Sequence, residues 1–106
     1  MNVPYQKETN DLKGILSNKF GILREDDTAP EGVYRYYIEK RTRPESYYVS
    51  ITLNKDGFVC GLYIIHRIYD ILSQNGAGEG SVYKVVLCDT YIDKDILEKS
   101  LEIAHL

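Results

Sequence analysis

Two histidines and two cysteines are the residues of this 106-residue sequence best suited to acid–base or nucleophilic chemistry near neutral pH. An imidazole titrates in this range and can activate a thiol nucleophile beside it. His66 with Cys60 or Cys88 would make such a pair, whereas His105 is the penultimate residue, a position prone to fraying. Both cysteines occur in apolar, strand-like runs that favour buried, reduced thiols, and His66 begins an expected helix, where a capping or solvated role is common. We therefore predict that the protein is not an enzyme.

Acidic residues occur close together at three places, which raises the question of a metal site. The three places are residues 26–27, 93–95 and 98–102. They have the character of a charged loop, the first turn of a helix and an exposed helix face, respectively. None is flanked by histidines at the spacing of metal ligands. The sequence predicts no metal site and no cofactor.

A glycine-rich segment at residues 76–80 resembles a phosphate-binding loop only superficially. It follows an expected helix and precedes an expected strand, whereas nucleotide-binding loops run from a strand into a helix. It also contains Glu79, which would repel phosphate, and it lacks the lysine of a P-loop. We interpret it as a linker.

Tyrosine is the most informative residue type of the chain, with ten tyrosines and no tryptophan. Half of them occur in two short runs, at residues 34–37 and 47–48, that are typical of neighbouring β-strands. Consecutive side chains of a strand point to opposite faces, so these rings cannot all lie in one core. Some of them must lie on the outside of a sheet, where they can contact a partner.

Basic residues alternate with these tyrosines. Residues 33–63 hold five basic and three acidic residues, although the chain as a whole has a net charge of −3. Aromatic rings with nearby cations suit single-stranded nucleic acid, and tyrosine and arginine are also enriched at protein-binding hot spots. Glu39 and Glu45 dilute the patch, so we favour a protein partner. The candidate partner-binding residues are Tyr34, Arg35, Tyr36, Tyr37, Arg41, Arg43 and Tyr48, with Asp26 and Asp27 of an exposed acidic loop.

The periodicity of apolar residues predicts the elements that must position these side chains. Helical spacing and capping residues favour helices, and strict alternation between bounding turns favours strands. The predicted helices are 9–19, 64–74 and 94–104, and the predicted strands are 33–42, 46–53, 58–63 and 82–88. Residues 61–66 fit a strand as well as a helix, and strand register leaves open which tyrosine face of residues 33–42 is buried. Residues 24–32 are expected to form an exposed acidic loop, and residues 76–81 a flexible one.

These elements predict one α+β domain over residues 1–106. Its antiparallel sheet has about four strands with helices packed on one face, in the order α-β-β-β-α-β-α. We expect the helices to cover the sheet face that carries Tyr47, Val49, Ile51 and Leu53. No apolar stretch is long enough to span a membrane, and the first ten residues are too polar for a secretion signal. We expect a cytoplasmic protein.

The function that these features favour is binding of another macromolecule. A compact acidic domain is suited to blocking a basic active site or nucleic-acid channel, because opposite potentials steer the encounter. We expect an inhibitor whose partner has a basic surface, such as an immunity protein against a bacterial toxin or a phage protein that blocks a defence nuclease. The alternatives are a single-stranded nucleic-acid binder, which is less favoured, and a homodimerising structural module.

Overall fold

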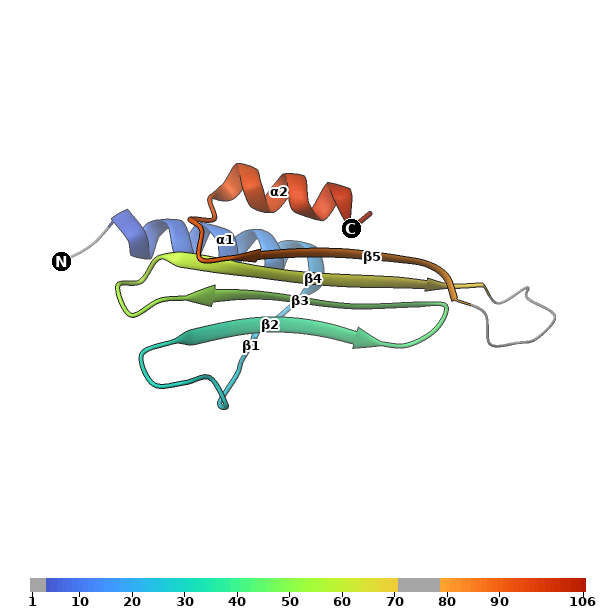
Figure 1. Ribbon diagram of the computed structural model, residues 1–106, viewed down its shortest axis with the longest axis horizontal. Helices are drawn as coiled ribbons and strands as arrows, with labels where there is room; N and C mark the ends of the chain where they lie inside the picture. Colours follow the sequence, from blue (N-terminus) through green and yellow to red (C-terminus); the bar gives the residue numbers. More distant parts are fainter. Residues whose placement is uncertain (1–3, 71–78) are drawn as a thin grey trace.

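A single antiparallel sheet with two helices forms the structure, a computed structural model that describes residues 4–70 and 79–106. The helices are α1 (Pro4–Phe20) and α2 (Lys94–Ile103). The strands are β1 (Arg24–Glu25), β2 (Tyr34–Arg41), β3 (Glu45–Leu53), β4 (Val59–Tyr69) and β5 (Glu79–Cys88). Each strand pairs with the next along the chain, so the spatial order of the five strands is their sequence order (Figure 1).

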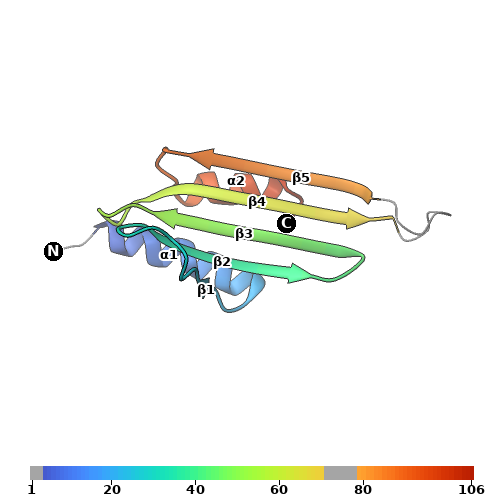
Figure 2. The ribbon, with the colours of Figure 1, turned by 60° about the horizontal axis from the view of Figure 1, so that its bottom comes forward.

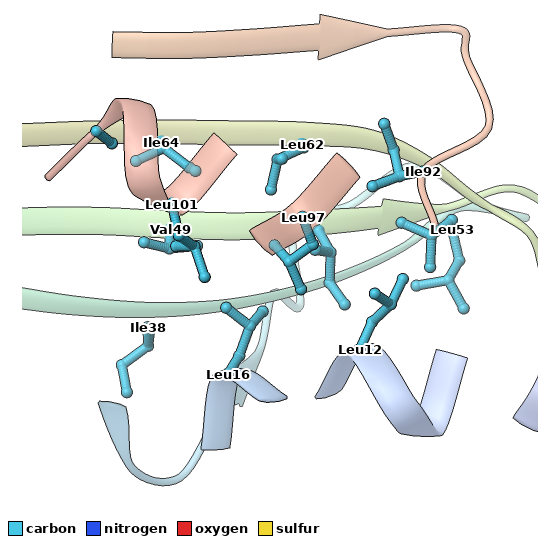
Figure 3. Packing of buried hydrophobic residues seen from close by; sticks show 13 residues of the cluster. Leu12, Leu16, Ile38, Val49, Leu53, Leu62, Ile64, Ile92, Leu97 and Leu101 are labelled. Atoms are coloured by element: carbon cyan, nitrogen blue, oxygen red, sulfur yellow. The ribbon is translucent and has the colours of Figure 1, made fainter. Parts of the chain in front are cut away.

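Both helices lie on the same face of the sheet, with α1 and α2 side by side (Figures 1 and 2). The core lies between the two layers, where leucines of the helices meet aliphatic residues of β3 and β4 (Figure 3). Its fully buried members include Leu16, Val49, Ile51, Leu62 and Leu97. The α+β class and the helix-covered face of β3 are therefore confirmed.

The predicted helix at 64–74 is wrong for the residues that the structure describes, because β4 continues as a strand to Tyr69. Ile64 and Ile68 fit both a helical and an extended period, so the local pattern did not distinguish a helix from a strand. Pairing with β3 on one side and β5 on the other does distinguish them. The order is thus α-β-β-β-β-β-α, and residues 71–74 lie outside the described residues.

The expected loop at 24–32 also contains regular structure. Arg24 and Glu25 pair with Tyr37 and Tyr36, which makes β1 a short fifth strand at one edge of the sheet. The expected loop at 76–81 is likewise only partly described, and its residues 79–81 belong to β5. Asp93 is the N-cap of α2, since its carboxylate accepts a hydrogen bond from the Ile96 amide at 2.9 Å.

Of the described helices, neither α1 nor α2 is long and apolar enough to cross a membrane.

Candidate protein-binding surface

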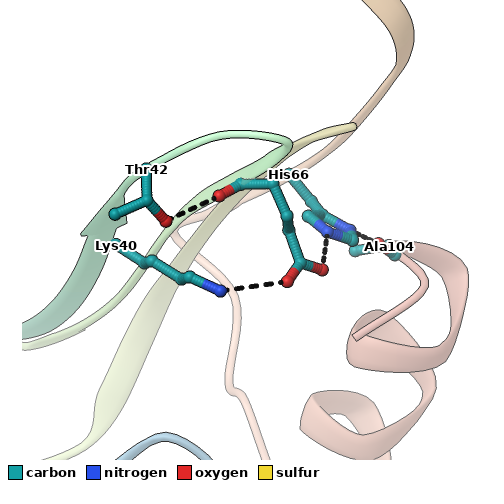
Figure 4. Close-up of polar contacts among 5 residues, drawn as sticks. Lys40, Thr42, His66 and Ala104 are labelled. Carbon is teal, nitrogen blue, oxygen red and sulfur yellow. Dashed lines mark hydrogen bonds and ion pairs between the residues drawn. The ribbon is translucent and has the colours of Figure 1, made fainter. Parts of the chain in front are cut away.

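The Cys–His pair considered for catalysis is not assembled. His66 lies in β4 rather than at a helix start, and its side chain is buried in the core layer. Its Nδ1 lies 2.7 Å from the Ala104 carbonyl oxygen, and its Nε2 lies 2.7 Å from Glu45 Oε2 (Figure 4). Both ring nitrogens are therefore engaged by oxygen atoms.

The two thiols lie far from this imidazole along the strands. Cys60 is six residues from His66 on β4, about 20 Å in an extended strand. Cys88 pairs with Gly61, five residues away, and is exposed rather than buried as predicted, because it ends the edge strand β5. Both cysteines are free thiols.

The face of the sheet turned away from the helices is the candidate surface, and we call it the open face. In Figure 2 the sheet lies in front and both helices lie behind it. Alternation along the strands and the pairing registers assign its residues. They are Arg24, Arg35, Tyr37, Glu39, Arg41, Ser46, Tyr48, Ser50, Thr52, Gly61, Tyr63, Ile65, Arg67, Val82, Lys84, Val86 and Cys88.

Three tyrosines form a cluster at the centre of the open face, one from each of β2, β3 and β4. The ring centroids of Tyr37 and Tyr48 lie 5.6 Å apart in a stacked arrangement, and those of Tyr48 and Tyr63 lie 5.7 Å apart. Ser50, which pairs with Tyr37 on one side and Tyr63 on the other, is only 3% exposed. We infer that the three rings cover this serine, although no helix lies over it.

A shallow hollow of about 700 Å³ adjoins this tyrosine cluster. Its floor includes Gly61, where a Cβ atom would lie 3.3 Å from the Cβ atom of Thr52. The side chains of Arg35, Tyr63 and Cys88 line it. The missing side chain at Gly61 thus leaves a depression beside the cluster.

Basic side chains surround the tyrosine cluster. Among the described residues, the open face has five basic side chains and one carboxylate, that of Glu39. Two cations are partly neutralised, because Arg35 pairs with Asp26 at 3.2 Å and Arg41 with Glu39 at 3.0 Å. Lys84 Nζ lies 5.6 Å from the Tyr63 ring centroid. The face is therefore positive in a chain whose net charge is −3.

The predicted site residues separate onto different parts of the molecule. Arg35, Tyr37, Arg41 and Tyr48 come together on the open face. Tyr34 and Tyr36 lie on the opposite face beside α1, and Arg43 lies in the turn after β2 with its guanidinium 4.4 Å from the Tyr69 ring. Asp27 is exposed in the turn after β1.

The side-chain pKa values of two of these residues are shifted. The backbone amide and hydroxyl of Thr28 both donate to Asp26 Oδ1, and these hydrogen bonds, with a smaller contribution from Arg35, lower the pKa of the Asp26 carboxyl. Burial raises the pKa of Tyr36, whose ring lies 4.0 Å below Lys13 Nζ. Asp26 is therefore already committed to local contacts, and Tyr36 to the helix layer.

Sequence reasoning missed the part of the open face that comes from β1, β4 and β5. The missed residues are Arg24, Tyr63, Ile65, Arg67, Lys84 and Val86. Ile65 and Arg67 were missed because their segment was interpreted as a helix, and Tyr63 ended the predicted strand before it. The usable signal was the alternation of Leu62, Ile64 and His66 with the outward residues between them.

The described residues contain no group of three or more histidine, cysteine or acidic side chains that could hold a metal ion. Comparison of the chain with protein-family models, with curated proteins and with solved structures finds no match.

Proposed function

We propose that this protein binds another protein through the open face and thereby inhibits it. The observation that supports the proposal is the tyrosine cluster, a group of large amphipathic rings that neither helix covers. Tyrosine buries a large area on docking with little loss of rotamer entropy, and it is enriched at interface hot spots. The adjoining hollow offers a depression for a side chain of the partner.

The charge of the open face indicates the surface that such a partner presents. Five cations against one carboxylate favour an acidic patch, rather than the basic surface that the net charge of the whole chain suggested. Opposite potentials at the rim would steer association. The four long strands, β2 to β5, at about 4.8 Å spacing and about 30 Å of strand length give a face of about 600 Å², near the ~800 Å² per partner of stable complexes.

Single-stranded nucleic acid is the second candidate, and the same cations favour it. Base stacking requires free ring faces. In the cluster, however, Tyr37 and Tyr48 stack on each other and Lys84 lies over Tyr63. These contacts occupy ring faces that bases would need, so we place a protein partner first.

Capture experiments with matched variants test the proposal. The wild-type protein and the variant Tyr34→Ala, which changes an exposed ring on the other face, are expected to retain the same partner from an extract of the native host. Tyr48→Ala is expected to lose it, and only the retaining forms should inhibit the purified partner. Fluorescence anisotropy with labelled single-stranded RNA and DNA at low salt is run in parallel. Binding that depends on Tyr48, without any captured protein, would replace this proposal by the second candidate.

A further inference from the structure

The outer edge of β5 is the longest open strand edge of the described sheet. β5 has ten residues and is last in the strand order, whereas at the opposite edge the two-residue strand β1 pairs with part of the eight-residue strand β2. In Figure 2 none of the labelled elements lies beyond β5 on that side. Such an edge presents unpaired backbone donors and acceptors that can pair with another strand.

The residues of this edge are complementary to a second copy of themselves. If two β5 strands paired antiparallel about Val85, Tyr83 would face Leu87 of the other copy, and Val85 would face Val85. On the open face, Lys84 would face Val86 and Val82 would face Cys88. Each apolar side chain would gain an apolar or aliphatic neighbour, and the two lysines would avoid direct opposition.

We propose that this protein forms a homodimer by antiparallel pairing of β5 with β5 of a second copy, centred on Val85. The exposure of the strand supports this occupant. Val82 and Val86 are 45% and 50% exposed, and Tyr83, Val85 and Leu87 border the core but are only partly buried. Pairing covers these five side chains and continues the sheet across the two-fold axis.

The helix layer is compatible with this arrangement. α2 lies over β4 and β5, so a two-fold axis beside β5 brings the two α2 helices to about 10 Å, a normal helix packing distance (Figure 2). The axis is perpendicular to the sheet and leaves both open faces on the same side. The inference does not depend on the proposed function, although a dimer would present two docking surfaces together.

Disulfide trapping tests the pairing and its register. Val82→Cys, combined with Cys60→Ser, places a new thiol opposite Cys88 of the second copy, and mild oxidation is expected to give a covalent dimer at low protein concentration. Ser46→Cys in the same background is the control, because Ser46 shares the register row of Val82 but lies two strands inside the sheet. It is expected to crosslink at least tenfold more slowly.

Light scattering over a concentration series completes the test. The wild type is expected to have twice the monomer mass of 12.2 kDa, and Val86→Lys, which sets two lysines opposite each other, is expected to be a folded monomer. A wild type that is monomeric at every concentration overturns the proposal. The proposal is also overturned if the wild type is a dimer but the Val82→Cys and Ser46→Cys variants crosslink equally slowly, because such a dimer would use another surface. If the wild type is a monomer that captures a different protein, and Val86→Lys abolishes this capture, the β5 edge binds that protein and not a second copy.

Discussion

The Nε2 atom of His66, in β4, lies 2.7 Å from Oε2 of Glu45, which begins β3 directly after the turn from β2. The other ring nitrogen of His66 lies 2.7 Å from the Ala104 carbonyl oxygen at the end of α2. A carbonyl oxygen accepts and cannot donate, and an ionised carboxylate does the same. The two contacts are both satisfied when the ring is an imidazolium that donates twice. This buried side chain therefore ties α2 to the hairpin.

Glu45 makes the stability of the fold sensitive to acid. The hydrogen bond from His66, assisted by Lys40, lowers the pKa of the Glu45 carboxyl below its usual value of 4.5. A carboxyl whose pKa is lowered by folding contributes stability above about pH 4.5, and this contribution is lost as the pH falls towards the folded-state pKa. Denaturant unfolding at pH 7 and pH 3.5 should show a larger loss for the wild type than for Glu45→Gln. An equal loss in both proteins would contradict this role for Glu45.

Removal of the imidazole should destabilise the fold. His66→Leu leaves the Ala104 carbonyl and Glu45 Oε2 without the ring nitrogens that contact them, so we expect the free energy of unfolding to fall by about 1 to 3 kcal/mol. Chemical denaturation monitored by circular dichroism measures this change. His105→Ala is the matched control, because that ring is exposed and stacks on Tyr83. The loss of unfolding free energy caused by His105→Ala should be several times smaller.

The inward face of β3 could be predicted from the sequence, whereas the inward face of β2 and the far side of the sheet could not. Alternation in β3 identified Val49 and Ile51 as inward residues, and the structure buries both. For β4, two isoleucines fit either period, and only pairing with the distant strand β5 selects the extended form. The local alternation of Leu62, Ile64 and His66 fits the strand, but by itself it does not exclude the helix.

The candidate surface was predictable to the same extent. Strand parity placed Tyr48 on the outward face of its strand and Tyr37 on the opposite face from Tyr36, but it did not decide which of Tyr36 and Tyr37 turns outward. Tyr63 completes the cluster, but it was the last residue of a predicted strand whose pairing partners the sequence did not show, so it was not recognised as part of the surface. The burial of Ser50 depends on all three rings together, so no inspection of β3 by itself could have shown it.

Truncation of a cluster tyrosine should cost much less stability than truncation of a core residue. Ile51 is fully buried between the sheet and the helices, so Ile51→Ala should lower the free energy of unfolding by about 2 to 5 kcal/mol. Tyr37 is only half-buried and stacks on one ring, so Tyr37→Ala should lower it by about 1 kcal/mol. Urea denaturation of both variants provides the comparison. If Tyr37→Ala unfolds the domain, the ring is structural and the docking role loses its support.

A side chain at Gly61 should raise the floor of the hollow beside the tyrosine cluster. The Cβ atom of Gly61→Ala would contact Thr52 at 3.3 Å, so we expect a small destabilisation, relieved by a slight movement of Thr52. If the hollow receives a side chain of the partner, Gly61→Ala should weaken capture of that partner while the circular dichroism spectrum stays unchanged. Gly14→Ala is the control, since nothing lies within 4 Å of an added Cβ there, and it should leave capture intact.

Reversal of charge on the open face should slow association with the proposed partner. Lys84 and Arg24 lie at opposite margins of the tyrosine cluster, and rim charges act mainly through the association rate. Lys84→Glu should therefore lower the association rate constant several-fold in surface plasmon resonance at low salt, with little change in the dissociation rate. The difference from wild type should shrink as salt screens the charges.

Lys99→Glu changes an exposed lysine of α2 on the other side of the molecule and should leave the rate unaltered. Equal effects of the two reversals would mean that the net charge of the chain, and not the open face, governs the encounter.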